Sequence, residues 1–423
     1  MKKGFTLIET LIAIAILVIV IVGIVGVLQM NIRIANRTSS RVGAVSLINK
    51  RMEMLRNLDY DNIGTIGGIP SGDIPQQETI ILNDIEYTLK TFIQYFDDLK
   101  DGIGENDENG ITADYKKARL EISWPSRNPA APVIAVSDFM PKGIESIIGG
   151  GTLSINIFDA QIQPISLANV HIINNDIIPL IDINVQTNDQ GKIVFPGSPS
   201  IGEYQITVTK NGYSTAQTYD AILENPSPSP GHLTILEGQT TDTSFTIDLL
   251  SSLTIQTLAN AVFDMTGEKT IGDLVYKYNE THISDIYGRT YIPELEWDLY
   301  DFSNFKIGSN LYDVSASSPP EPMSIEPGTI NIIEIFLVSH ATNTLLITVR
   351  DNNQELVSSA SVRLYKVGYD ETILTQEFGQ SFFTPLQSAN YNLEVSKMGY
   401  QTYLLEDFEI NNNQEINITI NIP

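Results

Sequence analysis

An uncharged stretch near the N-terminus constrains this chain more than any other feature. Between Glu9 and Arg33 the sequence runs for 23 residues without a charged side chain. As an α-helix this stretch is about 35 Å long, which is enough to cross a bilayer core of about 30 Å. Few core helices of soluble domains stay apolar on every face over such a length. The stretch therefore predicts a membrane-spanning helix rather than a buried one.

The residues at the start of this stretch distinguish two kinds of signal. A secretory signal has a basic start, a short apolar region and a small-residue cleavage site behind it. Lys2 and Lys3 fit the basic start, but the A-x-A triplet at Ala13 and Ala15 lies inside the apolar run. The sequence therefore favours a break before the run, between Gly4 and Phe5.

Glu9 places an acid at the edge of the apolar span. An ionised carboxylate at the middle of a bilayer costs about 2.5–3.5 kcal/mol, so acids in such spans are commonly functional and paired with a cation. A free α-amino group on Phe5 of a neighbouring subunit would supply that cation. The alternative is that Glu9 lies at the membrane interface, where water solvates it and it has no partner.

The segment Lys2-Lys3-Gly4-Phe5-Thr6-Leu7-Ile8-Glu9, followed by a long apolar helix, resembles the class III signal of type IV prepilins and pseudopilins. This resemblance implies that prepilin peptidase cuts after Gly4 and that the new N-terminal Phe5 is N-methylated. It also implies that Glu9 sets the register of subunits by pairing with a neighbour's N-terminus during filament assembly. The motif says little about the rest of the chain.

A helical pattern continues beyond the apolar run. An amphipathic stripe is indicated by five apolar residues that recur three or four positions apart: Val45, Ile48, Met52, Leu55 and Leu58. Three arginines lie four positions apart on a polar face, where they are either solvated or meet headgroups and acidic neighbours: Arg33, Arg37 and Arg41. We expect residues 1–4 to be a leader and residues 5–60 to be one helix that ends near 57–61.

Charge is divided unevenly along the 423 residues, whose net charge is −26. Residues 1–60 carry eight Lys or Arg and three acids, a balance of +5, and residues 61–423 have a balance of −31. Nucleic-acid binding needs a basic footprint, so the acidic body argues against a nucleic-acid partner. The chain has no cysteine, which excludes disulfides, thiolate metal sites and thiol nucleophiles.

Residues 61–127 are expected to form a small β head behind the helix. Segments 78–96 and 114–124 alternate apolar and polar residues and are rich in β-branched and aromatic side chains. A long helix backed by a small antiparallel sheet is the arrangement of type IV pilins, so this prediction agrees with the resemblance.

An acidic, glycine-containing segment separates these two strand regions. Calcium prefers about six to eight oxygen ligands from a flexible loop, which this segment can supply although its spacing is not that of an EF-hand. The candidate ligands are Asp97, Asp98, Asp101 and Asp107. The alternative is a solvated acidic turn, and no other cofactor is expected.

Three weak repeats follow residues 128–150, a Pro- and Gly-rich segment that we expect to be a linker. Each repeat opens with a strand that begins at a leucine: Leu153, Leu253 and Leu345. Each continues with an Ala-x-apolar strand and reaches a tyrosine after a turn: Tyr204, Tyr300 and Tyr391. About seven short strands per repeat predict β-sandwiches over residues 151–250, 251–338 and 339–423, in which the tyrosine is a candidate tyrosine-corner brace.

The repeats resemble the small carboxypeptidase-regulatory-like or collagen-binding B-type modules of bacterial surface proteins. The fold class predicted for the chain is therefore α+β: a long N-terminal transmembrane and amphipathic helix, a small antiparallel pilin-like head, then three tandem all-β sandwich modules. Two Pro/Ser-rich segments, residues 224–232 and 315–328, are expected to be long exposed loops for ligand contact or proteolysis.

The sequence shows no arrangement of catalytic residues. Its four histidines stand far apart, and H-E-x-x-H, G-x-S-x-G and P-loop motifs are absent. Four aromatic residues of the second repeat are candidates for stacking on sugars, although such residues more often fill a sandwich core: Tyr287, Tyr291, Trp297 and Tyr300. We expect the protein not to be an enzyme.

Together these features predict a type IV pilus minor pilin-like subunit. It would be held in the inner membrane before assembly, with residues beyond about 30 outside the cytoplasm, and then reach the pilus or cell surface. Expected partners are prepilin peptidase with its methyltransferase activity, other pilin subunits, the membrane, and a surface protein or glycan. Two alternatives remain: a type II secretion pseudopilin, and a single-pass membrane-anchored surface-binding protein that enters no filament.

Overall fold

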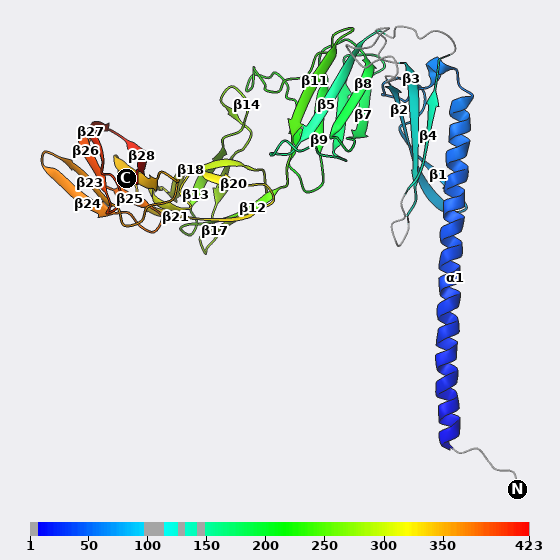
Figure 1. Ribbon diagram of the computed structural model, residues 1–423, viewed down its shortest axis with the longest axis horizontal. Helices are drawn as coiled ribbons and strands as arrows, with labels where there is room; N and C mark the ends of the chain where they lie inside the picture. Colours follow the sequence, from blue (N-terminus) through cyan, green and yellow to red (C-terminus); the bar gives the residue numbers. More distant parts are fainter. Residues whose placement is uncertain (1–6, 97–113, 126–131, 142–148, 423) are drawn as a thin grey trace.

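The computed structural model describes residues 7–96, 114–125, 132–141 and 149–422 (Figure 1). A long helix, α1 (Leu7–Arg56), leads through a short 3-10 helix, η1 (Tyr60–Asn62), into a small sheet. Three further β modules follow in a row that leads away from the helix, and the C-terminus lies in the last of them. The predicted α+β fold class is confirmed, because the helix, the antiparallel head and the all-β modules occur in the expected order.

Four antiparallel strands form the head sheet, in the order β1-β2-β3-β4. Their bounds are β1 (Gln77–Leu82), β2 (Ile85–Phe96), β3 (Tyr115–Ser123) and β4 (Val133–Phe139). Asn83 and Asp84 join β1 to β2 and both have positive φ, as a two-residue type I′ turn requires. Alternate residues of β2 and β3 are buried beneath α1, which packs along the sheet (Figure 1).

Strand β4 shows that the predicted linker over 128–150 is wrong for residues 133–139. This segment pairs with β3 from Val133 opposite Ile122 to Phe139 opposite Lys116. Its half-buried and exposed residues alternate, which is a strand pattern. The prolines on either side dominated the composition and concealed that pattern. The fourth strand covers the edge of β3 that would otherwise be open.

Module 1 consists of two facing sheets, with orders β10-β9-β6-β7 and β11-β5-β8. The strands are β5 (Gly151–Phe158), β6 (Asn169–Asn174), β7 (Ile181–Gln186), β8 (Lys192–Ser198), β9 (Gln205–Thr209), β10 (Ala216–Gln217) and β11 (Thr240–Thr246). Inward residues of both sheets meet in one apolar core, so the module is a β-sandwich.

Module 2 is one continuous sheet that bends back to form two layers. Its strand order is β16-β13-β18-β19-β21-β12-β17, and β20 pairs with β18. The strands are β12 (Ser251–Gln256), β13 (Val262–Gly267), β16 (Asn279–Ile283), β17 (Arg289–Leu295), β18 (Asp298–Ile307), β19 (Asn310–Ser318), β20 (Met323–Ile325) and β21 (Ile330–Ser339). A small hairpin, β14 (Thr270–Gly272) and β15 (Val275–Tyr276), projects from it. β18 and β19 pair only at their turn, so the two layers enclose one core.

Module 3 returns to two separate sheets, β25-β22-β28 and β24-β23-β26-β27. The strands are β22 (Thr344–Asp351), β23 (Ser361–Lys366), β24 (Tyr369–Leu374), β25 (Gln380–Phe383), β26 (Ala389–Ser396), β27 (Tyr403–Ile410) and β28 (Asn413–Ile420). In all three modules the first strand pairs in parallel with the last: β5 with β11, β12 with β21, and β22 with β28. This shared pairing closes each repeat on itself.

The recurrent tyrosine forms the predicted brace in every module. Tyr204, Tyr300 and Tyr391 are each at most 1% exposed. Their hydroxyls donate to backbone carbonyls four or five residues upstream, at 2.8 Å to Pro199, 2.9 Å to Glu296 and 3.0 Å to Gln387. The hydroxyl is thus paired while the ring fills the core, as in a tyrosine corner.

The second Pro/Ser-rich segment, residues 315–328, is not the exposed loop that was predicted. It contains the end of β19 and all of β20, and Ala316, Ser317, Met323 and Ile325 are buried. Three of its prolines, Pro319, Pro320 and Pro322, lie between the two strands and Pro327 follows β20, so none of them interrupts a strand. The first segment, 224–232, is mostly exposed, but Asn225 and Ser229 form hydrogen bonds with Ile271 of module 2.

Candidate assembly interface

The N-terminal part of α1 extends away from every other element (Figure 1). From Ile16 onward the helix contains an 18-residue window with a mean hydropathy of 2.3 that is 0% buried. Among the described residues it is the one helix long and apolar enough to cross a membrane. At 50 residues α1 is about 75 Å long, more than twice the hydrocarbon thickness. One half can therefore sit in a membrane or a helix bundle while the other half carries the head.

The C-terminal part of α1 packs on the head sheet. Ala44, Ile48, Met52 and Leu55 share a buried core with residues of β2 and β3. Val45, which the sequence pattern placed in this stripe, is 40% exposed, and Ala44 takes the inward position instead. A spacing of three from Val45 to Ile48 and of four from Ala44 to Ile48 both suit a helix, so periodicity did not distinguish them.

Tyr87 of β2 fixes α1 against the sheet. Its hydroxyl donates a 2.9 Å hydrogen bond to the carbonyl of Ser40, and the bond is buried. Gly43 makes room for this contact, because a Cβ built there would lie 2.6 Å from the Tyr87 hydroxyl oxygen. Arg37 and Arg41, which lie near this contact in the sequence, are both exposed.

Lys116 of β3 fastens the segment that follows the helix. Its side chain is fully buried, and its Nζ donates a 2.7 Å hydrogen bond to the carbonyl of Tyr60 in η1. The ammonium also lies 4.6 Å from the centre of the Tyr60 ring and 5.4 Å from that of Tyr95. Burial lowers the pKa of Lys116 to about 8, and the nearby Asp61 opposes this shift. No pattern in the sequence indicates this contact, because the alternation along β3 predicts an apolar residue at a core position.

The residues predicted to govern processing lie at the start of the chain. Gly4 and Phe5 are outside the described residues, and Glu9 lies in α1, where only its place in the helix is described. Asp97, Asp98, Asp101 and Asp107 are also outside the described residues. The described strands on either side of this segment, β2 and β3, are antiparallel and pair as far as Phe96 opposite Tyr115. Calcium binding by that segment stays a prediction.

The aromatic residues proposed to contact sugars do not form one platform. Tyr300 is a core residue, Trp297 is half-buried beside Lys269, and Tyr287 and Tyr291 are exposed. The four histidines are likewise separate, and each has its own polar partner: His171 with Asp182, His232 with Glu203, His282 with Tyr278 and His340 with Asp313.

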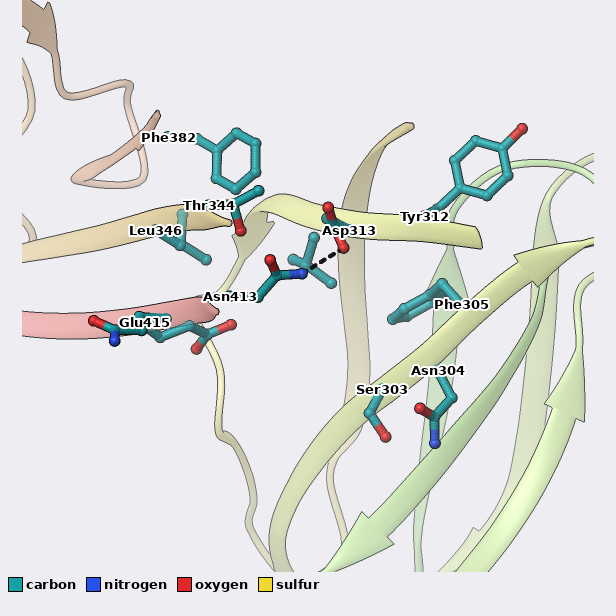
Figure 2. Close-up of a pocket in the computed structure, with 12 residues that line it drawn as sticks. Ser303, Asn304, Phe305, Tyr312, Asp313, Thr344, Leu346, Phe382, Asn413 and Glu415 are labelled. Atoms are coloured by element: carbon teal, nitrogen blue, oxygen red, sulfur yellow. Dashed lines mark hydrogen bonds between the residues drawn. The ribbon is translucent and has the colours of Figure 1, made fainter. Parts of the chain in front are cut away.

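Asp313 is the centre of the joint between modules 2 and 3. It is buried and accepts hydrogen bonds from His340 Nδ1 at 2.7 Å and from the Ala341 amide at 2.8 Å, both in the connecting segment. It also accepts one from Asn413 Nδ2 of module 3 at 2.8 Å (Figure 2). Asp313 and Asn413 line a pocket of about 180 Å³ together with Phe305 of module 2 and Phe382 of module 3 (Figure 2).

The head and module 1 are also in direct contact, as modules 2 and 3 are. Ile69, from the loop after η1, belongs to the core cluster of module 1 and is 4% exposed. The Asp182 amide of β7 donates a 2.8 Å hydrogen bond to the Gly67 carbonyl, and Gln76 Nε2 donates to the Asp182 carbonyl. A side chain from the head thus completes the core of the first module.

Comparison with known proteins identifies a sequence motif at the N-terminus. Residues 1–25 match the prokaryotic N-terminal methylation motif. No curated protein matches the chain. The motif match over residues 1–25 confirms the resemblance of the N-terminal segment to type IV prepilins and pseudopilins.

Solved structures match weakly. The TIE protein of Bacillus anthracis is 17% identical, over 82% of this chain and 73% of its own, with a TM-score of 0.19. The minor pilin GBS52 of Streptococcus agalactiae is 10% identical, over 41% and 96%, with a TM-score of 0.16. The major pilin BcpA of Bacillus cereus is 12% identical, over 64% and 99%, with a TM-score of 0.17. Likenesses this low support no argument about function, so the identification rests on the N-terminus: the chain carries a prepilin-type methylation motif and a long apolar helix ahead of a head and β-sandwich modules.

Proposed function

We propose that this protein is a type IV pilus minor pilin-like structural subunit that displays its three modules for adhesion or surface interaction. The observation that carries the proposal is the combination of the methylation motif with an apolar helix half that is 0% buried. An apolar surface of that length needs a membrane or neighbouring helices to cover it. A pilin-like subunit uses both in turn, the membrane before assembly and the helix bundle afterwards.

Processing follows from the motif. Prepilin peptidase would cut between Gly4 and Phe5, and methylation of the new amino group would follow. Glu9, now close to the N-terminus, would pair with the amino group of a neighbouring subunit. The head and modules would lie outside the cytoplasm. We assign the protein no catalytic role.

The size of the body favours a sparse position in the filament. A domain of about 90 residues has a radius of gyration of about 12 Å. Three such modules project sideways from the head (Figure 1). If every subunit of a tightly packed shaft carried them, neighbouring modules would collide. A tip or low-copy position avoids this crowding and leaves the modules accessible to a surface protein or glycan.

Two substitutions at the N-terminus test this proposal. Gly4→Ala should block cleavage and prevent display, whereas Glu9→Ala should be cleaved normally but enter filaments poorly. Glu53→Ala is the matched control, because Glu53 is an exposed acid of the same helix that pairs with Arg56 at 3.7 Å. Mass spectrometry of the mature N-terminus and immunoblots of sheared filaments are the readouts.

The outcomes separate the proposal from its alternatives. Unchanged processing and display of the Gly4→Ala protein would indicate a membrane-anchored surface protein that enters no filament. Normal incorporation of the Glu9→Ala protein would remove the register role of Glu9. A tag after Pro423, imaged on intact cells, should label filaments. Label confined to the envelope of a secreting cell would favour the secretion pseudopilin.

A further inference from the structure

Three segments of module 1 bring a histidine and two carboxylates together. The backbone around His232 is held on both sides: the Tyr219 amide donates to the Pro230 carbonyl at 2.9 Å, and Tyr204 and Leu233 exchange two hydrogen bonds of 3.0 Å. Glu203 immediately precedes Tyr204, and Asp220 immediately follows Tyr219. The pairing of these segments therefore places one acid on either side of His232.

Both carboxylates approach the same nitrogen atom. His232 Nδ1 lies 3.1 Å from Glu203 Oε2 and 3.5 Å from Asp220 Oδ1. The three potential ligand atoms all lie within 4.8 Å of one another. Zinc bonds to imidazole nitrogen and carboxylate oxygen are about 2.0–2.1 Å long, so neighbouring ligands of a tetrahedral ion are about 3.3 Å apart. The separations of His232 Nδ1 from the two carboxylate oxygens, 3.1 and 3.5 Å, bracket that value.

Charge and exposure also suit a cation. The imidazole side chain is 9% exposed, whereas the carboxylates are 60% and 70% exposed, so the site is closed on one side and open to water on the other. Within the part of the chain that the structure describes, no Lys or Arg forms an ion pair with Glu203 or Asp220. Two negative groups thus face one imidazole without a fixed cation.

We propose that Glu203, Asp220 and His232 form a binding site for a divalent first-row transition metal of the zinc class. An imidazole donor favours zinc and its neighbours in the series over calcium, which prefers ligands made up of oxygen atoms. Three protein ligands leave further coordination positions for water or for a donor group of a surface partner. The proposal does not depend on filament assembly.

Metal binding at this site would also hold the 224–232 segment. That segment reaches module 2, where the Asn225 side chain and the Ser229 amide donate to the Ile271 carbonyl, each at 2.9 Å. A bound ion would tie the base of the segment to two other loops. The backbone amides of Tyr219 and Leu233 should then exchange more slowly with zinc than with a chelator.

Zinc binding to the detergent-solubilised full chain tests the site, measured by competition with a chromophoric chelator in the presence of excess calcium. The wild-type protein should bind zinc at this site, and His232→Gln should weaken that binding by at least about tenfold. His171→Gln is the matched control, because His171 is another histidine of module 1 and pairs with the single carboxylate of Asp182 at 2.7 Å. The control should bind zinc as the wild type does.

A second variant guards against a folding defect. Glu203 and Asp220 are exposed, so the double change Glu203→Gln and Asp220→Asn should leave the metal-free melting temperature unchanged and still abolish binding. Absence of zinc binding by the wild type at millimolar zinc would overturn the proposal. So would wild-type affinity in either variant, and the cluster would then be only a polar contact between His232 and its neighbouring acids.

Discussion

Lys116 is a charged group at a core position of β3. Its folded-state pKa of about 8 lies below the ordinary lysine value of 10.5 because the ammonium is desolvated. Between these two values the unfolded chain binds more protons than the folded chain, so the free energy of unfolding rises with pH. The pKa of the adjacent Tyr95 is raised to about 12, so near pH 10, where an unfolded tyrosine loses its proton, Tyr95 opposes this rise.

We therefore predict that the head becomes more stable from pH 8 to pH 9 and that Lys116→Met removes this dependence. The slope should approach about 1.4 kcal/mol per pH unit, the value for one proton. Fluorescence of Trp124 in a Trp297→Phe background reports the head alone, since the chain has two tryptophans. Lys117→Met, on the same strand but partly exposed, should keep the wild-type slope. An equal slope in the Lys116→Met protein would contradict the prediction.

At the scale of elements, the contact between α1 and β2 depends on one missing side chain. Gly43 lies inside the helix, where glycine normally costs about 1 kcal/mol relative to alanine. Its absent Cβ leaves the space that the Tyr87 hydroxyl occupies on its way to the Ser40 carbonyl. Glycine thus lowers the intrinsic stability of the helix at this position, but it allows α1 to pack closer to the sheet.

Gly43→Ala should consequently destabilise the head by about 1–3 kcal/mol, as overpacked sites do. In a Tyr87→Phe background the same change should cost much less, because the atom 2.6 Å from the new Cβ is gone. Tyr87→Phe alone should cost about 1 kcal/mol for the lost hydrogen bond. Denaturant titrations followed by Trp124 fluorescence complete this double-mutant cycle. If the effects of the two changes on the free energy of unfolding were strictly additive, the contact with Tyr87 would not be the cause of the destabilisation by Gly43→Ala.

At the scale of the whole molecule, the head and the modules contact one another directly at the joints described. Ile69 of the head enters the core of module 1, Asn225 and Ser229 of module 1 bond to module 2, and Asp313 of module 2 bonds to module 3. Each joint combines residues from distant parts of the sequence. Specific contacts therefore hold each junction in the row of modules that Figure 1 shows.

Asp313→Ala should loosen the last of these joints without unfolding either module. It removes the acceptor of three hydrogen bonds that hold the connecting segment and Asn413. Hydrogen exchange of the Ala341 amide should accelerate, and small-angle scattering should show a broader distribution of overall dimensions. Asp264→Ala is the control, because Asp264 accepts hydrogen bonds from Thr281 and Asn304, which both belong to its own module. Unchanged exchange at Ala341 would argue that the joint has another source of rigidity.

Local patterns predicted much of the molecule. The uncharged run, the motif around Gly4, Phe5 and Glu9, and the three opening leucines indicated the helix, its processing signal and the repeats. The braces at Tyr204, Tyr300 and Tyr391 were also foreseen, because a tyrosine corner is made within a few residues of the chain. Strand β4 and the strands within 315–328 were not, because both are short and lie beside prolines, which are typical of loops.

The sequence by itself determined what depends on neighbours along the chain: a helix too apolar for water, strands with alternating faces, and an N-terminal processing motif. Only the tertiary structure decided which distant residues meet. It alone placed Ala44 rather than Val45 against the sheet, brought Lys116 under Tyr60, set Ile69 in another module's core, and gathered Glu203, Asp220 and His232. These contacts depend on strand order and module docking, which periodicity does not encode, since one residue's spacing to the next carries no information about a partner a hundred positions away.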